Sequence, residues 1–255
     1  MKHVVIKGLR LEYQEFPAAR PARPALVLLH DGLGCVESWR DFPARLAART
    51  GCRTLVGSRA GYGGSEAHEN PRTRRYLHDE ALEMLPPLLA AWEVERPVLV
   101  GHSDGANIAL LHASGFPSVP AGVVAMAPHE FVEAKTLAGI RATCRLWETK
   151  DLRQRLGRYH SDPDRVFAEW SQTWLSPGFQ DWNIEESLAA IRCPVLAIQG
   201  EDDEYASLRQ IEVIAERVPG TELLKLPACR HTPHRDQPEA VLAAIAAFID
   251  RIGPR

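Results

Sequence analysis

The chain has no long uninterrupted apolar run. Near the N-terminus Val4, Val5 and Ile6 are followed at once by Lys7, so this run is far shorter than a secretory signal or a membrane span requires. We therefore expect a cytoplasmic protein that has no membrane partner.

Cysteine is sparse and forms no pattern. The five cysteines are odd in number and contain no Cys-x-x-Cys pair, which argues against both a disulfide framework and a zinc site. We expect these thiols to be reduced and mostly structural, and we expect the protein to need no metal or other cofactor. The five are Cys35, Cys52, Cys144, Cys193 and Cys229.

An excess of basic charge is lacking as well. The formal net charge is −3, so there is no positive field for nucleic acid, and the short stretch Arg72–Arg75 is predicted to be a solvated face. Hydrophobic residues make up 45% and charged residues 25% of the chain, which are ordinary globular values. A small-molecule substrate is the expected partner, and the sequence leaves the oligomeric state open.

What the chain does contain is a regular alternation of strand and helix patterns. The apolar run Leu26–Leu29 is typical of a strand buried on both faces of a sheet. Strands that alternate with helices form βαβ units, so the 255 residues predict one α/β domain with a mostly parallel sheet flanked by helices. Strands are predicted at 4–7, 9–16, 26–29, 53–57, 98–100, 123–127, 194–199 and 222–226, and helices near 38–50, 73–92, 206–217 and 238–252.

The alternation stops for about sixty residues after the sixth core strand. Residues 129–192, approximately, contain helical stretches and turn signals, and they hold four of the six tryptophans. We interpret this segment as a small helical cap inserted into the single domain. Beyond it, Asp236 and Glu239 are spaced as the capping box of the last helix, which starts at Pro238.

The strand at 98–100 runs into Gly101-His102-Ser103-Asp104-Gly105. Such a Gly-x-Ser-x-Gly sequence between a strand and a helix is typical of a nucleophile elbow, in which a sharp turn lifts the serine hydroxyl to where a base can reach it. Chance can supply the pentapeptide alone, but the flanking strand and helix make Ser103 a candidate nucleophile.

A serine nucleophile needs a base and an acid that orients the base. Gly200-Glu201-Asp202-Asp203-Glu204 follows one later strand and His231 follows the last strand, at the sheet edge where open α/β sheets place their ligands. Several acids compete for the orienting role: Glu201, Asp202 and Glu204 beside Asp203, and Glu130 after the preceding strand. His231 and His234 form His-x-x-His, but the predicted loop and the lack of a completing ligand nearby disfavour a metal.

Four motifs together make the chain resemble the α/β-hydrolase family over essentially its whole length. They are His30-Asp31-Gly32-Leu33-Gly34 with Trp39 after it, Ser58-Arg59-Ala60-Gly61-Tyr62-Gly63-Gly64-Ser65, Gly101-His102-Ser103-Asp104-Gly105, and Gly200-x-x-Asp203 with His231. The resemblance implies the α/β-hydrolase fold, with Ser103 as nucleophile, Asp203 as orienting acid and His231 as general base.

The resemblance also implies an oxyanion hole made of two backbone amides. Asp104 would supply one, and Gly32 the other, with Leu33 as the alternative. Three residues depart from the family pattern: Asp31 and Arg230 replace glycines, and Ser58 replaces an acid. Asp31 and Arg230 lie near the predicted chemistry.

Residues around the nucleophile and in the cap are candidates for substrate binding. We expect His102 and His129 to line the pocket, together with some cap aromatics, for which Trp147, Trp170 and Trp174 are chosen. The Asp104 side chain either binds a substrate's amino group, as in similar hydrolases, or meets another partner, because an unpaired carboxylate beside an oxyanion is unfavourable.

These observations predict a serine hydrolase that cleaves a small, largely apolar ester or lactone through an acyl-enzyme. A hydrolase of a carbon–carbon bond in a diketone-like ring-cleavage product would use the same triad and a similar cap. A ligand receptor built on a hydrolase scaffold is the alternative from another functional class.

Overall fold

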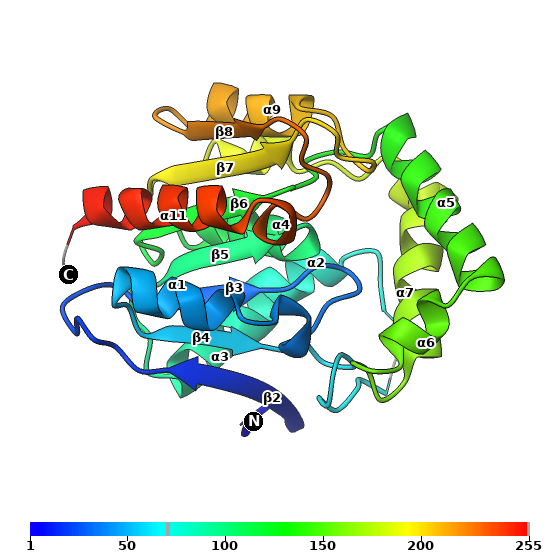
Figure 1. Cartoon of the computed structure of the whole chain (residues 1–255), viewed down its shortest axis with the longest axis horizontal. Helices are drawn as coiled ribbons and strands as arrows, with labels where there is room; N and C mark the ends of the chain where they lie inside the picture. Colours follow the sequence, from blue (N-terminus) through cyan, green and yellow to red (C-terminus); the bar gives the residue numbers. More distant parts are fainter. Residues whose placement is uncertain (70–71, 254–255) are drawn as a thin grey trace.

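The computed structural model describes residues 1–69 and 72–253, and it contains one eight-stranded sheet with the order β1-β2-β4-β3-β5-β6-β7-β8 (Figure 1). β1 and β2 are antiparallel to their neighbours, and the pairs from β4 to β8 are parallel. The predicted mostly parallel sheet is therefore confirmed. The strands are β1 (Lys2–Ile6), β2 (Leu9–Phe16), β3 (Leu26–Leu29), β4 (Thr54–Gly57), β5 (Val98–His102), β6 (Gly122–Met126), β7 (Val195–Gly200) and β8 (Glu222–Leu226).

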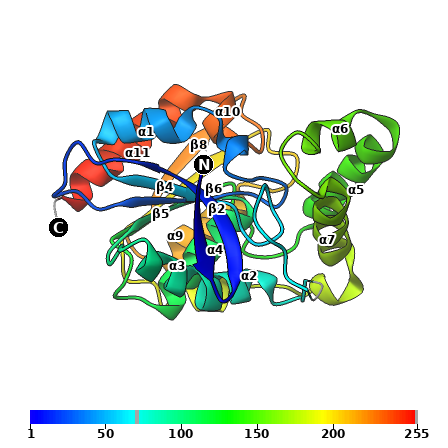
Figure 2. The ribbon, with the colours of Figure 1, turned by 90° about the horizontal axis from the view of Figure 1, so that it is seen from below.

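Helices cover both faces of this sheet, which explains why its central strands are apolar throughout. α1 (Phe42–Thr50) and α11 (Pro238–Ile252) lie on one face, while α3 (Leu85–Ala91), α4 (Asp104–Gly115) and α9 (Arg209–Arg217) lie on the other (Figure 2). Every residue of β5, β6 and β7 is buried. Such burial removes the alternation of apolar and polar residues seen in half-exposed strands.

The predicted helix at 73–92 is interrupted. It consists of α2 (Tyr76–Asp79), a π-helical segment η2 (Glu80–Met84) and α3. Pro86 and Pro87 explain the interruption, because neither has an N–H to donate to a carbonyl one turn earlier. The three segments follow one another without a gap, and Tyr76, the first residue of α2, donates its hydroxyl proton to Asp104 at 2.9 Å.

The chain between β6 and β7 forms a separate layer at one end of the sheet (Figures 1 and 2). It contains α5 (Ala134–Thr149), α6 (Leu152–Leu156) and α7 (Pro163–Leu175), which lie within the segment 129–192 interpreted above as a cap, and it is called the cap below. After η3 (Pro177–Phe179), the short α8 (Glu185–Leu188) already packs on α4 and α9 of the core. The outgoing and returning chains meet where the Ile184 N–H donates to the Glu130 carbonyl at 2.8 Å.

The predicted capping box of the last helix is wrong. Asp236 belongs to α10 (Pro233–Asp236), Gln237 precedes α11, and no side chain caps that helix. The carboxylate of Asp236 instead accepts the backbone N–H of Arg230 at 2.8 Å. Asp236 therefore bonds the loop before α10 instead of the N-terminus of α11. This hydrogen bond holds the segment that carries His231.

The basic stretch is only partly the solvated face that the sequence indicates. Arg74 and Arg75 are exposed, but the side chain of Arg72 is buried, with its guanidinium 4.4 Å from the centre of the Tyr76 ring. In the described ranges, no helix has the length and apolar character needed to cross a bilayer.

Candidate active site

Ser103 lies at the sharp turn between β5 and α4, with φ 53° and ψ −118°. A side chain on Gly105 would place its Cβ 2.0 Å from the Leu29 carbonyl oxygen, and one on Gly101 would come 2.2 Å from the Gly105 carbonyl oxygen. Only glycine permits this close approach of backbones, so the two glycines allow the strained serine conformation of a nucleophile elbow.

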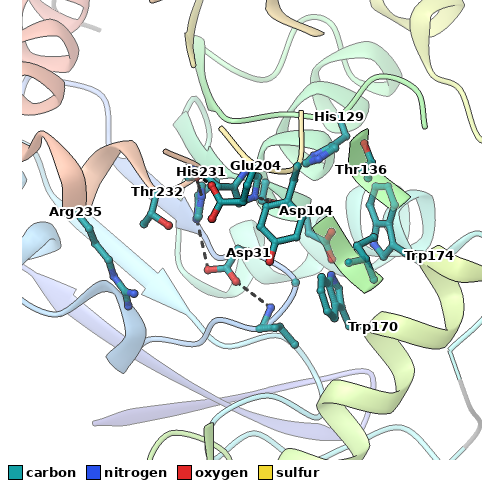
Figure 3. A pocket seen from close by; sticks show the side chains of 16 residues that line it. Asp31, Asp104, His129, Thr136, Trp170, Trp174, Glu204, His231, Thr232 and Arg235 are labelled. Atoms are coloured by element: carbon teal, nitrogen blue, oxygen red, sulfur yellow. Dashed lines mark hydrogen bonds and ion pairs between the residues drawn. The ribbon is translucent and has the colours of Figure 1, made fainter. Parts of the chain in front are cut away.

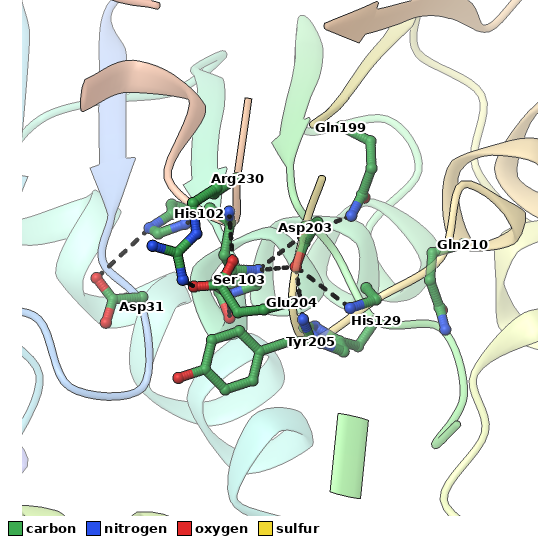
Figure 4. Close-up of polar contacts among 12 residues, drawn as sticks. Asp31, His102, Ser103, His129, Gln199, Asp203, Glu204, Tyr205, Gln210 and Arg230 are labelled. Carbon is green, nitrogen blue, oxygen red and sulfur yellow. Dashed lines mark hydrogen bonds and ion pairs between the residues drawn. The ribbon is translucent and has the colours of Figure 1, made fainter. Parts of the chain in front are cut away.

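Asp203, His231 and Ser103 form one hydrogen-bonded chain (Figure 4). His231 Nδ1 lies 3.0 and 2.9 Å from the two Asp203 carboxylate oxygens, and His231 Nε2 lies 3.1 Å from Ser103 Oγ. Because a carboxylate only accepts, Nδ1 carries the proton and Nε2 is free to accept the serine proton. The three residues predicted from separate motifs thus meet with the geometry of a general-base relay.

The charge on Asp203 is stabilised by its hydrogen-bond donors. Burial alone would raise the pKa of Asp203, but His231 and the Tyr205 amide outweigh it, so this pKa lies below its ordinary value. Its oxygens also accept from Gln199 Nε2 at 2.5 Å and from the Tyr205 and Ala206 amides at 2.8 and 3.2 Å.

The interaction between Asp203 and His231 raises the pKa of His231. Burial lowers its pKa, but the charge of Asp203 and their hydrogen bond raise it more, and the resulting pKa lies above the ordinary imidazole value.

The other acids considered for orienting His231 do not contact its imidazole in the described residues. Glu201 and Asp202 are exposed, whereas Glu204 accepts the His231 backbone N–H at 3.1 Å and pairs with Arg230 at 2.8 Å. Glu130 is fully buried, and neither of its carboxyl oxygens has a partner within the described residues. Arg230, which departs from the family pattern, therefore helps to tie the histidine loop to the acid loop through Glu204.

Gly32 and Asp104, the predicted sources of the oxyanion-hole amides, line the same cavity as Ser103. Asp104 is the first residue of α4, where a backbone N–H has no acceptor within the helix. In the other loop the Leu33 N–H already donates to the Asp31 carboxylate at 2.9 Å, which leaves Gly32 as the available donor. Between the two predicted candidates, this geometry favours Gly32. The Asp31 side chain, a departure from the family pattern, makes the difference.

A cavity of about 210 Å³ opens over Ser103 (Figure 3). His102, His129, Trp170 and Trp174 line it, as expected, whereas Trp147 does not and instead stacks on Phe167 with ring centres 4.1 Å apart. The lining also includes residues that the sequence reasoning missed: Thr136, Ile140, Glu204, Tyr205, Thr232 and Arg235. Glu204 and Thr232 directly follow Asp203 and His231 in the sequence, which is a signal that could have found them.

The Asp104 carboxylate faces this cavity but is not free. One oxygen accepts the Tyr76 hydroxyl proton at 2.9 Å and lies 3.6 Å from Arg59 Nη2. Burial raises the pKa of Asp104, and the nearby Arg59 opposes this shift. The sequence left two roles for the Asp104 side chain, binding of a substrate amino group or contact with another partner. The structure provides such partners in Tyr76 and Arg59.

The histidines near the site have separate environments. His102 Nε2 lies 2.8 Å from the His231 carbonyl oxygen, so it supports the loop behind the base. The His129 ring is centred 5.5 Å from that of His231, and burial lowers the pKa of His129 to about 3, which keeps it neutral. His234 packs against Trp39, with ring centres 4.6 Å apart.

Comparison with known proteins identifies the family of the chain. The family described as "Alpha/beta hydrolase family" matches residues 26–244. The "Serine hydrolase BPHL" of Mus musculus is 25% identical over 242 residues, which is 91% of this chain and 80% of the mouse protein.

Solved structures resemble the fold along nearly the whole chain. The enol-lactonase from Burkholderia xenovorans has a TM-score of 0.76 at 17% identity, covering 98% of this chain and 100% of its own. A meta-cleavage product hydrolase from Pseudomonas fluorescens has a TM-score of 0.74 at 17% identity, covering 98% of both chains.

Proposed function

Because the chain belongs to the α/β-hydrolase family, we propose that it is a serine hydrolase that cleaves a small ester or lactone through an acyl-enzyme on Ser103. The observation that carries this proposal is the continuous hydrogen-bonded chain from Asp203 through His231 to Ser103 Oγ, at the base of a cavity. A serine without such a base is a weak nucleophile.

The proposed cycle follows from the positions of these groups. His231 Nε2 accepts the Ser103 proton as Oγ attacks the ester carbonyl, and the developing oxyanion lies between the Gly32 and Asp104 amides. His231 then gives that proton to the leaving alkoxide, which departs as an alcohol or, for a lactone, stays attached to the acyl group. A water molecule that gives its proton to His231 hydrolyses the acyl-enzyme and restores Ser103.

The cavity limits the substrate in size and shape. About 210 Å³ accommodates a small acyl group. Trp170, Trp174 and Ile140 offer the apolar surface on the cap side, whereas Thr232 and Arg235 offer polar groups on the histidine side. We propose that the apolar part of the substrate lies against the cap.

Covalent labelling tests the nucleophile. A fluorophosphonate should label the wild-type chain once, and Ser103→Ala should abolish both labelling and ester hydrolysis. Retained stoichiometric labelling of Ser103→Ala would exclude Ser103 as the nucleophile. Ser161→Ala, at a serine outside the cavity lining, serves as the control and should be labelled like the wild type.

A substrate panel tests the reaction. Short acyl esters and lactones should turn over many times per protein molecule. Turnover of a vinylogous diketone with the esters left intact would instead establish the carbon–carbon hydrolase. A single turnover that stops at the acyl-enzyme would favour the receptor alternative.

A further inference from the structure

Arg59 lies directly behind the loop that carries Gly32. It follows β4, and its side chain is only 8% exposed. Nη1 donates to the His30 carbonyl at 2.7 Å and Nη2 donates to the Asp31 carbonyl at 3.0 Å, while the Arg59 backbone N–H donates to His30 Nε2 at 3.0 Å. One residue thus holds both peptide carbonyls that precede Gly32.

The second of these carbonyls belongs to the same peptide unit as the Gly32 N–H. In a planar trans peptide the C=O and N–H bonds point in opposite directions. A donor that holds the Asp31 carbonyl from one side therefore aims the Gly32 N–H towards the other side, where the oxyanion would form. Two further donors hold this carbonyl. The Gly34 N–H donates to it at 3.3 Å, and His30 Nδ1 donates at 2.8 Å, since His30 Nε2 accepts from Arg59 and Nδ1 therefore carries the proton.

The same guanidinium reaches the residue that supplies the other amide. Arg59 Nη2 lies 3.6 Å from the Asp104 carboxylate, which also accepts the Tyr76 hydroxyl proton at 2.9 Å. Tyr76 in turn accepts from Trp174 Nε1 at 2.9 Å. Because Trp174 belongs to α7, a continuous chain of polar contacts runs from the cap through Tyr76, Asp104 and Arg59 to the loop of Gly32.

We propose that Arg59 is the positioning residue of the oxyanion hole, which fixes both amide donors at once, and that Tyr76 holds the Asp104 side of this arrangement. The inference rests on the proposed serine hydrolase mechanism. Arg59 does not touch the substrate; it acts through the peptide unit of Gly32 and through Asp104. A buried arginine that only joins a loop to a helix would affect folding, whereas a positioning residue affects the transition state more than substrate binding.

Arg59→Lys is the variant that separates these roles. Lysine keeps the charge but loses the planar fork that reaches two carbonyls and a carboxylate together. Losing an oxyanion donor outright costs about 10²–10³-fold in kcat, so misaligning one should slow acylation by about 10–100-fold. KM for p-nitrophenyl acetate should change by less than about threefold, since the ester carbonyl gains its main interactions only in the transition state.

Affinity for phenylboronic acid gives a second readout. Boron forms a tetrahedral adduct with a serine hydroxyl that mimics the oxyanion intermediate, so its affinity should fall in proportion to the acylation rate. A role confined to folding would lower the melting temperature and leave the boronate affinity of the folded fraction unchanged.

Arg53→Lys is the matched control. Arg53 bonds the same kinds of group, the Glu15 carboxylate at 2.7 Å and the Trp92 carbonyl at 2.8 Å, but at the start of β4 and outside the cavity lining. Its acylation rate and boronate affinity should stay within about twofold of wild type, as expected for a residue away from the chemistry. If Arg59→Lys matches Arg53→Lys in both readouts, the inference is overturned.

Tyr76→Phe keeps the test decisive if Arg59→Lys does not fold. Removing the hydroxyl frees Asp104 and leaves Trp174 Nε1 without its acceptor, so acylation and boronate affinity should fall together by about 3–10-fold. Unchanged values would overturn the inference. Failure of the proposed function has a different signature, because the wild-type chain itself would then show no Ser103-dependent turnover.

Discussion

The segments after β6 and β7 each place a carboxyl group in the interior, Glu130 and Asp203, and both side chains are fully buried. Asp203 accepts hydrogen bonds from three donors besides His231, and its pKa lies below the ordinary value. Glu130 meets none in the described part of the chain, and burial raises its pKa well above the ordinary value. Donors, rather than depth, therefore decide which of the two is charged.

The comparison also explains which acid can orient the base. An ionised Asp203 stabilises the imidazolium that forms on His231, whereas a protonated Glu130 at the base of the cap has no charge to offer. Its backbone carbonyl accepts the Ile184 N–H at 2.8 Å, so Glu130 lies where the chain leaves the core and where it returns.

The largest expected effect comes from removing the charge at Asp203. Asp203→Asn should lower kcat by about 10⁴-fold, because an amide can donate to His231 and hold it in the wrong tautomer. Glu130→Gln is the matched control and should leave kcat within about twofold, as for a change away from the reacting groups. Equal losses in the two variants, measured with one ester, would contradict the assignment of the orienting acid.

The pH profile sharpens the contrast. His231 acts only when neutral, and its raised pKa places the acid limb of kcat/KM above the ordinary imidazole value of 6.5. In Asp203→Asn the charge that raises this pKa is gone while burial still lowers it, so the limb should move to lower pH. A limb that stays in place would mean that another group titrates.

A smaller effect is expected at Glu204, the acid beside Asp203 in the sequence. Glu204→Gln weakens the contacts with Arg230 and the His231 amide, so kcat should fall by about 3–10-fold, a loss typical of one charge-assisted hydrogen bond. Asp202→Asn changes an exposed neighbour and should have no such effect. Equal kcat values in the two variants would remove Glu204 from the support of the base.

The smallest effect is on stability at Glu130. Above pH 4.5 Glu130 ionises in the unfolded chain, while in the folded chain its raised pKa favours the protonated form. The free energy of unfolding of the wild type should therefore decrease as the pH rises from 4.5 towards the folded pKa of Glu130. Glu130→Gln has no proton to lose. Its melting temperature relative to wild type should therefore rise from pH 4 to pH 8, while the exposed Glu186→Gln should show no trend.

Much of the site was predictable because its chemistry lies in short motifs at strand ends. Ser103, Asp203 and His231 each follow a recognisable strand, and parallel strands bring their carboxyl ends to one edge. The cap was predictable only as a helical segment. Which of its tryptophans faces Ser103 depends on how α5 and α7 pack, so Trp174 reaches the site while Trp147 stacks on Phe167 within the cap.

The sequence by itself determined the sheet, the elbow and the order of the triad, since periodicity and local turn chemistry specify them. Only the tertiary structure decided that Asp236 bonds Arg230 instead of capping α11, that the Leu33 N–H donates to the Asp31 carboxylate, and that Arg59 contacts both the Asp31 carbonyl and the Asp104 carboxylate. These contacts depend on directions of side chains and backbone that are set by packing between distant segments, and a pattern along the chain does not contain those directions.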